Sequence, residues 1–162
     1  MKFLIFGHKG WIGSMIVKLL KKQNINFVCA KSRAENKKAV EEEILLEKPT
    51  HVMSFIGRTH GTTEDGTKYT TIDYLEQKGK IKENVRDNLF APMVLGLLCK
   101  KHNIHFTYLG TGCIFKYDEK HLFGDESTGF LESDLPNFFE SSYSTVKGYT
   151  DQLMHLLEDN CL

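Results

Sequence analysis

The chain lacks a surplus of charge of either sign. Its 162 residues include 21 Lys and Arg and 21 Asp and Glu, so the formal net charge is zero. Proteins that bind nucleic acid or an anionic membrane need a basic surplus, so this balance argues against both kinds of partner. Apolar residues make up 41% of the chain and charged residues 26%, which are usual values for a folded domain. A disordered chain would be poorer in apolar residues and unbalanced in charge.

The sequence also lacks a long apolar run and paired cysteines. The apolar run at residues 3–6 ends at Gly7, and it is far too short for a membrane-spanning helix or the core of a signal peptide. The four cysteines show no CxxC spacing, so we expect reduced thiols in a cytoplasmic protein. His102 and His105 are three residues apart, but they span a predicted helix end and a strand start. We therefore expect no metal site.

Segments with strand and helix patterns alternate along the chain. Short apolar runs predict buried parallel strands at residues 2–6, 26–30, 51–56 and 105–109. Apolar residues at helical spacing predict helices at residues 11–22, 34–47, 81–102 and 141–158, with a kink at Pro92. Residues 57–72 read as a polar loop, and residues 161–162 as the start of a further strand. This alternation predicts an α/β fold, a Rossmann-like doubly wound parallel sheet with helices on both faces.

A glycine-rich loop joins the first predicted strand to the first predicted helix. Glycine there allows a tight turn and lets backbone N–H groups approach a diphosphate, which the helix N-terminus attracts. The pattern GxxGxxG in this position predicts a dinucleotide site. The alternative is a turn that only packs a helix on the sheet. The predicted cofactor-binding residues of this loop are Gly7, Lys9, Gly10, Trp11, Ile12 and Gly13.

The second predicted strand ends without the acidic residue that would bind the ribose of NAD. Its end reads Ala30-Lys31-Ser32-Arg33, and Arg33 is one of only three arginines in the chain. A carboxylate would repel a 2′-phosphate, whereas Lys, Ser and Arg would hold one. We therefore predict NADPH (NADP) as the cofactor, with Ser32 and Arg33 at its 2′-phosphate and Lys9 adding charge. The alternative is that these are solvated surface charges.

Tyr143 and Lys147 form a YxxxK pair at the start of the last predicted helix. A spacing of four places both side chains on one helix face. The ordinary pKa of a tyrosine is about 10, and a nearby ammonium stabilises the phenolate and lowers that value. Tyr143 could then protonate an oxygen that gains charge when hydride arrives. Together with the glycine loop, the pair predicts hydride transfer.

With these motifs, the chain resembles an extended short-chain dehydrogenase/reductase of the branch that modifies nucleotide sugars. GHKGWIGSMI is similar to the glycine loop of GDP-L-fucose synthases. TGCIFKYDEKH and GFLESDLPNFFESSYSTVKG resemble the bifunctional 3,5-epimerase/4-reductases that complete UDP- or dTDP-L-rhamnose from a 4-keto-6-deoxy sugar. The resemblance implies that Thr111 binds the substrate carbonyl, and that Asn88 distorts the long helix and supports a proton relay. It also implies cofactor contacts at Tyr143, Lys147 and the end of the third strand, Phe55, Ile56 and Gly57.

The resemblance further implies a catalytic Cys113, two residues after Thr111. A 4-keto group acidifies the protons on C3 and C5, so a thiolate nearby can remove one before Tyr143 and NADPH reduce the ketone. Arg58 and His60 follow the end of a strand, where such sheets bind ligands, and are candidates to meet the sugar diphosphate. The alternatives are a small apolar residue at position 113 and an exposed loop pair at 58 and 60.

Other functions stay open. A dTDP-4-dehydrorhamnose reductase would not need Cys113, and a GDP-L-fucose synthase would take another nucleotide. A non-catalytic NADP-binding regulatory subunit, like that of methionine adenosyltransferase, is a different class. Since enzymes of this family are longer, we expect residues 1–162 to form the NADP-binding domain with the core catalytic residues, without the C-terminal substrate-binding part. The expected partner is UDP- or dTDP-4-keto-6-deoxyglucose; the oligomeric state stays open, a homodimer included.

Overall fold

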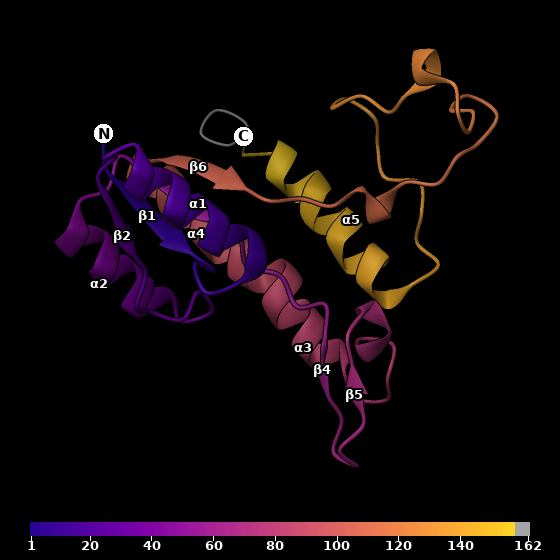
Figure 1. The fold of residues 1–162 in the computed structure, drawn as a ribbon, viewed down its shortest axis with the longest axis horizontal. Helices are drawn as coiled ribbons and strands as arrows, with labels where there is room; N and C mark the ends of the chain where they lie inside the picture. Colours follow the sequence, from indigo (N-terminus) through magenta and orange to yellow (C-terminus); the bar gives the residue numbers. More distant parts are fainter. Residues whose placement is uncertain (158–162) are drawn as a thin grey trace.

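A computed structural model describes residues 1–157 and places a parallel four-stranded sheet at the centre of the fold (Figure 1). The strand order is β2-β1-β3-β6, and all three neighbouring pairs are parallel. The strands are β1 (Phe3–Phe6), β2 (Phe27–Cys29), β3 (His51–Ser54) and β6 (His105–Tyr108). Each lies within a predicted apolar run. Glu158 and the strand predicted to begin at residue 161 lie outside the described residues.

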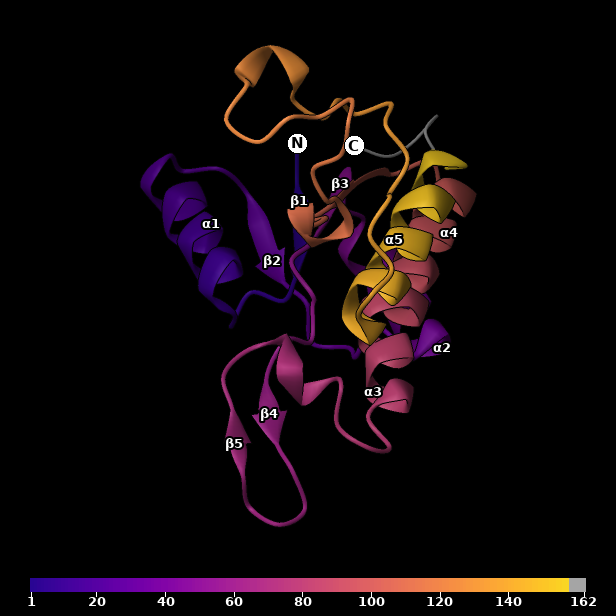
Figure 2. The ribbon, with the colours of Figure 1, turned by 90° about the vertical axis from the view of Figure 1, so that its right-hand side faces the viewer.

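Helices cover both faces of the sheet, which confirms the predicted fold class. β2 and β3 lie on opposite sides of β1, so right-handed crossovers place their connecting helices on opposite faces. Figure 2 shows α1 on one face and α2, α4 and α5 on the other, and α4 contacts both α2 and α5. The helices are α1 (Trp11–Lys22), α2 (Lys37–Glu47), α3 (Ile81–Val85), α4 (Ala91–Lys101) and α5 (Ser142–His155).

The main core lies between the sheet and α4. Leu4 on β1, Val52 on β3 and Phe106 on β6 are fully buried, and they share one hydrophobic cluster with Leu95 of α4. β1, the central strand with buried residues on both faces, explains the continuous apolar run at the start of the sequence. The second predicted helix begins later than expected because Asn36 caps it by accepting a hydrogen bond from the Ala39 N–H at 3.2 Å.

The third predicted helix is not continuous. Between α3 and α4 lies a π-helical turn, η2 (Arg86–Phe90), and Pro92 sits in the first turn of α4. Pro92 has no N–H for the carbonyl of Asn88, four residues earlier in η2, so the helix is irregular in the turn before the proline, where a proline disturbs a helix. Asn88 lies within η2, as the expected helix distortion requires.

The segment predicted as a polar loop contains a small hairpin. β4 (Gly61–Thr62) pairs antiparallel with β5 (Lys68–Tyr69), and the hairpin extends away from the sheet (Figure 1). A short 3-10 helix, η1 (Ile72–Tyr74), follows and brings the Tyr74 ring against Gly61. Strands of two residues carry no periodicity, which explains why the sequence did not reveal them. Two further 3-10 turns, η3 (Gly112–Ile114) and η4 (Glu126–Thr128), lie in the long segment before α5.

Gly13 allows α1 to pack tightly on the glycine loop. A Cβ at this position would lie 2.2 Å from the Gly7 carbonyl oxygen, a contact that only a backbone shift can relieve. We expect Gly13→Ala to lower the free energy of unfolding by about 1–3 kcal/mol, the usual cost of overpacking. Denaturant unfolding would measure it. Gly110→Ala is the matched control, because a Cβ there meets nothing within 4 Å. Equal stability of the two variants would contradict this packing role.

Candidate active site

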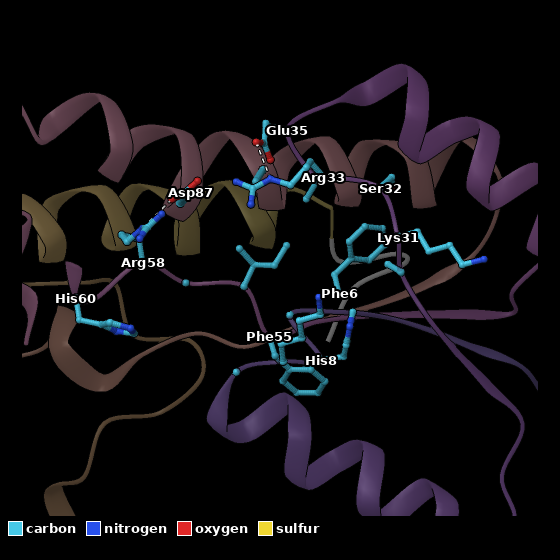
Figure 3. Close-up of a pocket in the computed structure, with 18 residues that line it drawn as sticks. Phe6, His8, Lys31, Ser32, Arg33, Glu35, Phe55, Arg58, His60 and Asp87 are labelled. Atoms are coloured by element: carbon cyan, nitrogen blue, oxygen red, sulfur yellow. Dashed lines mark hydrogen bonds and ion pairs between the residues drawn. The ribbon is translucent and has the colours of Figure 1, made fainter. Parts of the chain in front are cut away.

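A cavity of about 390 Å³ opens where β1, β2 and β3 end (Figure 3). Its volume lies in the range of small-molecule and cofactor sites. β1 has β2 on one side and β3 on the other, so it lies where the strand order reverses. Open α/β sheets bind ligands in the crevice at this point. The lining comprises residues 6–10, 30–35, 55–58, His60, Asp87 and Ala91.

The glycine loop fits a diphosphate group. Gly7 has φ of +75°, and a Cβ there would lie 2.6 Å from the Phe55 carbonyl carbon, so glycine alone lets the loop approach β3. No side chain caps α1 at Gly10, and the first turn holds no acidic residue. The partial positive charge of this helix end is therefore left for an anion.

The predicted cofactor residues divide into two groups. Gly7, Lys9 and Gly10 line the cavity, together with Phe55, Ile56 and Gly57. Trp11, Ile12 and Gly13 lie outside the lining; Trp11 is 81% exposed, and Gly13 is buried against the loop backbone. His8 also lines the cavity, a residue the glycine pattern did not single out.

The β2 end of the cavity is electrostatically mixed. Arg33 lines it, but its Nε lies 3.1 Å from Glu35 Oε1, the ion pair drawn in Figure 3. The Ser32 hydroxyl donates to Glu43 Oε2 at 2.5 Å, and the Lys31 and Ser32 N–H groups donate to the same carboxylate at 2.8 and 2.9 Å. Ser32 is therefore already engaged by a residue that the sequence patterns missed.

Glu43 carries its charge despite partial burial. Burial acts to raise the pKa of this carboxyl, but the hydrogen bonds from Ser32 and Lys31 outweigh it and leave the pKa below its ordinary value. The turn after β2 thus bonds to an anion from its own chain. The cationic side chains of this turn that line the cavity are Lys31 and Arg33, of which Arg33 is paired with Glu35.

Arg58 and His60 line the same cavity as the glycine loop. The Arg58 Nε contacts Asp87 Oδ2 at 3.1 Å, and Arg86 Nε contacts Asp87 Oδ1 at 2.7 Å. Burial acts to raise the pKa of Asp87, yet the hydrogen bonds from Arg86 and Arg58 hold it below the ordinary value. Asp87 therefore stays ionised and fixes Arg58 at the cavity wall, as Figure 3 shows.

Asn88 holds the Arg58 backbone and joins it to α5. Its Oδ1 accepts from the Arg58 N–H at 2.9 Å, and its Nδ2 donates to the Arg58 carbonyl at 2.9 Å. The Asn88 carbonyl accepts from the Thr150 hydroxyl of α5 at 2.8 Å. Both Asn88 and Thr150 are fully buried. Asn88 thus connects the cavity to the helix that carries Tyr143.

The structure brings Thr111, Cys113 and Tyr143 together at the start of α5. The Thr111 hydroxyl lies beside the Tyr143 phenol and accepts from the Cys113 N–H at 3.2 Å. Burial raises the pKa of Tyr143, the Thr111 contact acts to lower it, and a charge on Cys113 would raise it. Cys113 is exposed, whereas Tyr143 is only 6% exposed and packs with Tyr74 and Leu75. A ketone oxygen held by Thr111 and Tyr143 would leave its neighbouring carbons within reach of Cys113.

Lys147 is buried beside a second tyrosine. Its Nζ donates to the Tyr108 hydroxyl and to the Leu109 carbonyl at 3.4 Å, and lies 4.4 Å from the centroid of the Tyr108 ring. Burial lowers the pKa of Lys147 to about 8, with Asp151 acting in the opposite direction. Burial, together with Tyr143 and Asp151, raises the pKa of Tyr108 well above its ordinary value. Tyr108 belongs to no motif in the sequence, so sequence reasoning missed it.

A distant carboxylate caps the helix of the YxxxK pair. Glu76 Oε2 accepts from the Ser142 N–H at 3.0 Å, and its Oε1 accepts from the Tyr143 N–H at 3.2 Å. A negative charge at a helix N-terminus stabilises the helix, and here the bond to the Tyr143 N–H also holds the backbone of Tyr143 in place. Glu76 lies 66 residues before Ser142, so no local pattern could have identified it.

Two negative findings apply to residues 1–157. No group of three His, Cys, Asp or Glu side chains in this range could hold a metal ion. None of its helices has both the length and the apolar character needed to cross a bilayer.

Comparisons with known proteins agree with this geometry. Residues 3–160 match the model of the NAD dependent epimerase/dehydratase family. Protein L780 of Acanthamoeba polyphaga mimivirus is 57% identical over all of this chain, which spans 54% of that protein's length. Its crystal structure, that of a UDP-rhamnose synthase, matches with a TM-score of 0.90.

A plant relative is named for a related activity. The trifunctional UDP-glucose 4,6-dehydratase/UDP-4-keto-6-deoxy-D-glucose 3,5-epimerase/UDP-4-keto-L-rhamnose-reductase RHM1 of Arabidopsis thaliana is 34% identical over 99% of this chain and 22% of its own length. A dTDP-4-dehydrorhamnose reductase from Clostridium acetobutylicum shares the fold, with a TM-score of 0.76 at 20% identity over 99% of this chain and 51% of that one. The matched family, the fold and the glycine-loop cavity together confirm the resemblance: the chain belongs to the NAD dependent epimerase/dehydratase family, among the extended short-chain dehydrogenase/reductases with an NAD(P)-binding Rossmann fold.

Proposed function

We propose that this chain is the NADPH-binding and catalytic part of an enzyme that converts a nucleotide-linked 4-keto-6-deoxyglucose to nucleotide-L-rhamnose. The observation that carries the proposal is the assembly of Thr111, Cys113 and Tyr143 at the start of α5. A thiol beside a phenol suits an enzyme that both epimerises and reduces. UDP is the favoured nucleotide, since both L780 and RHM1 are named for UDP sugars.

In the first half-reaction, Cys113 acts next to the ketone. Thr111 and Tyr143 hold the 4-keto oxygen, so that negative charge can develop on it when a proton leaves C3 or C5. The exposed thiol of Cys113 takes that proton as a thiolate, and an acid on the opposite face returns one. The configuration at both carbons is thereby inverted.

In the second half-reaction, NADPH bound at the glycine loop would supply the hydride for C4. Tyr143 donates its proton to the oxygen as negative charge builds there. The buried ammonium of Lys147, one helical turn further along α5, favours the phenolate that remains. A non-catalytic NADP-binding subunit would have no use for these three groups, Cys113, Tyr143 and Lys147, in one place.

NADPH is the proposed cofactor because cations lie at the β2 end of the cavity. Arg33 and Lys9 line the cavity on two different loops, and together they would hold the 2′-phosphate. With the Ser32 hydroxyl bound to Glu43, the side chain of Arg33 carries most of the selection. Arg58 and His60 are the proposed contacts of the substrate diphosphate, at the opposite end of the same lining.

The first prediction concerns cofactor selection. We expect Arg33→Ala to weaken NADPH binding by about 10-fold to 100-fold, the loss of a charge-assisted hydrogen bond, and to leave NADH binding unchanged. Fluorescence titration with each nucleotide would measure both dissociation constants. Lys38→Ala, which removes an exposed charge on α2, is the control. Equal affinity of the unmodified protein for NADPH and NADH would contradict the selection.

The second prediction separates the two half-reactions. With UDP-4-keto-6-deoxyglucose and NADPH in deuterated water, NMR should show a rhamnose product labelled at C3 and C5. We expect Cys113→Ala to lose the label by about 100-fold or more while still reducing a pre-epimerised sugar. Tyr143→Phe should lose the reduction and, because Tyr143 also helps to hold the ketone oxygen, it should slow deuterium uptake at C3 and C5 as well.

Cys29→Ala is the control for the cysteine variant, since Cys29 is a free thiol on β2 away from Tyr143. Deuterium uptake that survives in Cys113→Ala would remove the thiol from the mechanism. NADPH binding without consumption of any keto sugar, combined with one stoichiometric protein partner, would instead support a regulatory subunit.

A further inference from the structure

Lys147 is shared between two tyrosines on different elements. Tyr143 precedes it by one turn of α5, and Tyr108 faces it from the end of β6. Within the described part of the chain, the ammonium donates to the hydroxyl of Tyr108 and to the carbonyl of Leu109. The YxxxK spacing alone would place the ammonium with Tyr143. The structure thus adds a group to the pair that the motif predicts.

The surroundings of Lys147 make this contact necessary. The side chain is only 4% exposed, and a buried ammonium is costly unless polar groups replace its water. The titratable groups that face it are Tyr108 from β6, and Tyr143 and Asp151 from α5, with Cys113 beside Tyr143. Among these groups, the Tyr108 hydroxyl is the one that accepts a hydrogen bond from the Lys147 ammonium.

We propose that Tyr108 is a positioning residue that keeps Lys147 charged and in place for Tyr143. The hydroxyl accepts a hydrogen bond from the ammonium, which stabilises the charged form of Lys147. A charged Lys147 in turn stabilises the Tyr143 phenolate. The role of Tyr108 in turnover rests on the proposed reduction, whereas its effect on the charge of Lys147 does not.

The direction of the effect follows from these contacts. Removing the Tyr108 hydroxyl takes away an acceptor that favours the ammonium, so the pKa of Lys147 falls below its value of about 8. At pH 8 a larger share of Lys147 is then neutral. The phenolate of Tyr143 loses support, and the alkaline limb of the pH–rate profile moves to lower pH.

The experiment is an NMR titration of Lys147 without substrate. The lysine Cε resonances of the whole chain are followed against pH, and Lys147→Arg identifies the signal of Lys147 by its loss. We expect Tyr108→Phe, which keeps the ring and removes the hydroxyl, to lower the titration midpoint of Lys147 by about one pH unit. Tyr149→Phe, an exposed tyrosine on α5, is the matched control and should leave the midpoint unchanged.

Kinetics provide the second readout. In Tyr108→Phe, kcat at pH 8 should fall about fivefold with the KM for NADPH unchanged, and acidification should recover the rate. A loss of stability alone would not move the alkaline limb. If Tyr108→Phe does not fold, 3-fluorotyrosine at position 108 replaces it, because fluorine weakens the phenol oxygen as an acceptor and should lower the midpoint by a smaller amount.

The two proposals fail separately. An unchanged Lys147 midpoint in Tyr108→Phe, or in the fluorotyrosine protein, overturns the role of Tyr108 whatever the enzyme turns over. A lowered midpoint in a protein that consumes no keto sugar supports the contact between Tyr108 and Lys147, but it overturns the proposed reduction.

Discussion

The position of the cavity relative to α5 depends on the hydrogen bonds of one residue, Asn88. The α-helical partner of the Asn88 carbonyl would be the N–H of residue 92, but Pro92 has none, and the Thr150 hydroxyl of α5 donates to this carbonyl instead. The side chain of Asn88 accepts from and donates to the Arg58 backbone. Because Asn88 and Thr150 are fully buried, water cannot replace these hydrogen bonds without a large cost in free energy. One irregular turn therefore sets the position of the cavity wall relative to Tyr143.

Burial and charge act against each other across the whole site. Tyr143 and Lys147 are both buried, which by itself would raise the pKa of the phenol and lower that of the ammonium. Asp87 and Glu43 face the same penalty, yet hydrogen bonds from arginines and from a turn keep both ionised. The charged groups at the cavity are thus held by partners inside the chain. At the cavity an incoming anion meets Arg58, which Asp87 holds in place, and the exposed side chains of Lys9 and Arg33.

The sequence predicted the features that short segments encode. Each strand appears as an apolar run that ends near a glycine or a polar residue, so β1 and β3 were found within two residues of their observed ends. The glycine loop was found because its chemistry is local. Helical spacing alone did not reveal the π-helical turn, because it does not show one extra residue per turn; the distortion at Asn88 was expected only from the family resemblance. Hydrogen-bond partners that are distant in sequence were also missed: Glu76 lies 66 residues from Ser142, and Tyr108 lies 39 residues from Lys147.

The cap that Glu76 places on α5 bears on how this protein could be re-engineered. Glu76 follows the β4–β5 hairpin, and the neighbouring Tyr74 and Leu75 pack with Tyr143. A designer who replaced residues 57–80 by the corresponding stretch of a relative would leave every cofactor contact on β1 and β2 untouched. The exchange would nevertheless change the surroundings of the Tyr143 phenol, because the residues that pack against its ring and cap its helix lie in the exchanged segment. Residues 57–80 and α5 therefore have to be exchanged together.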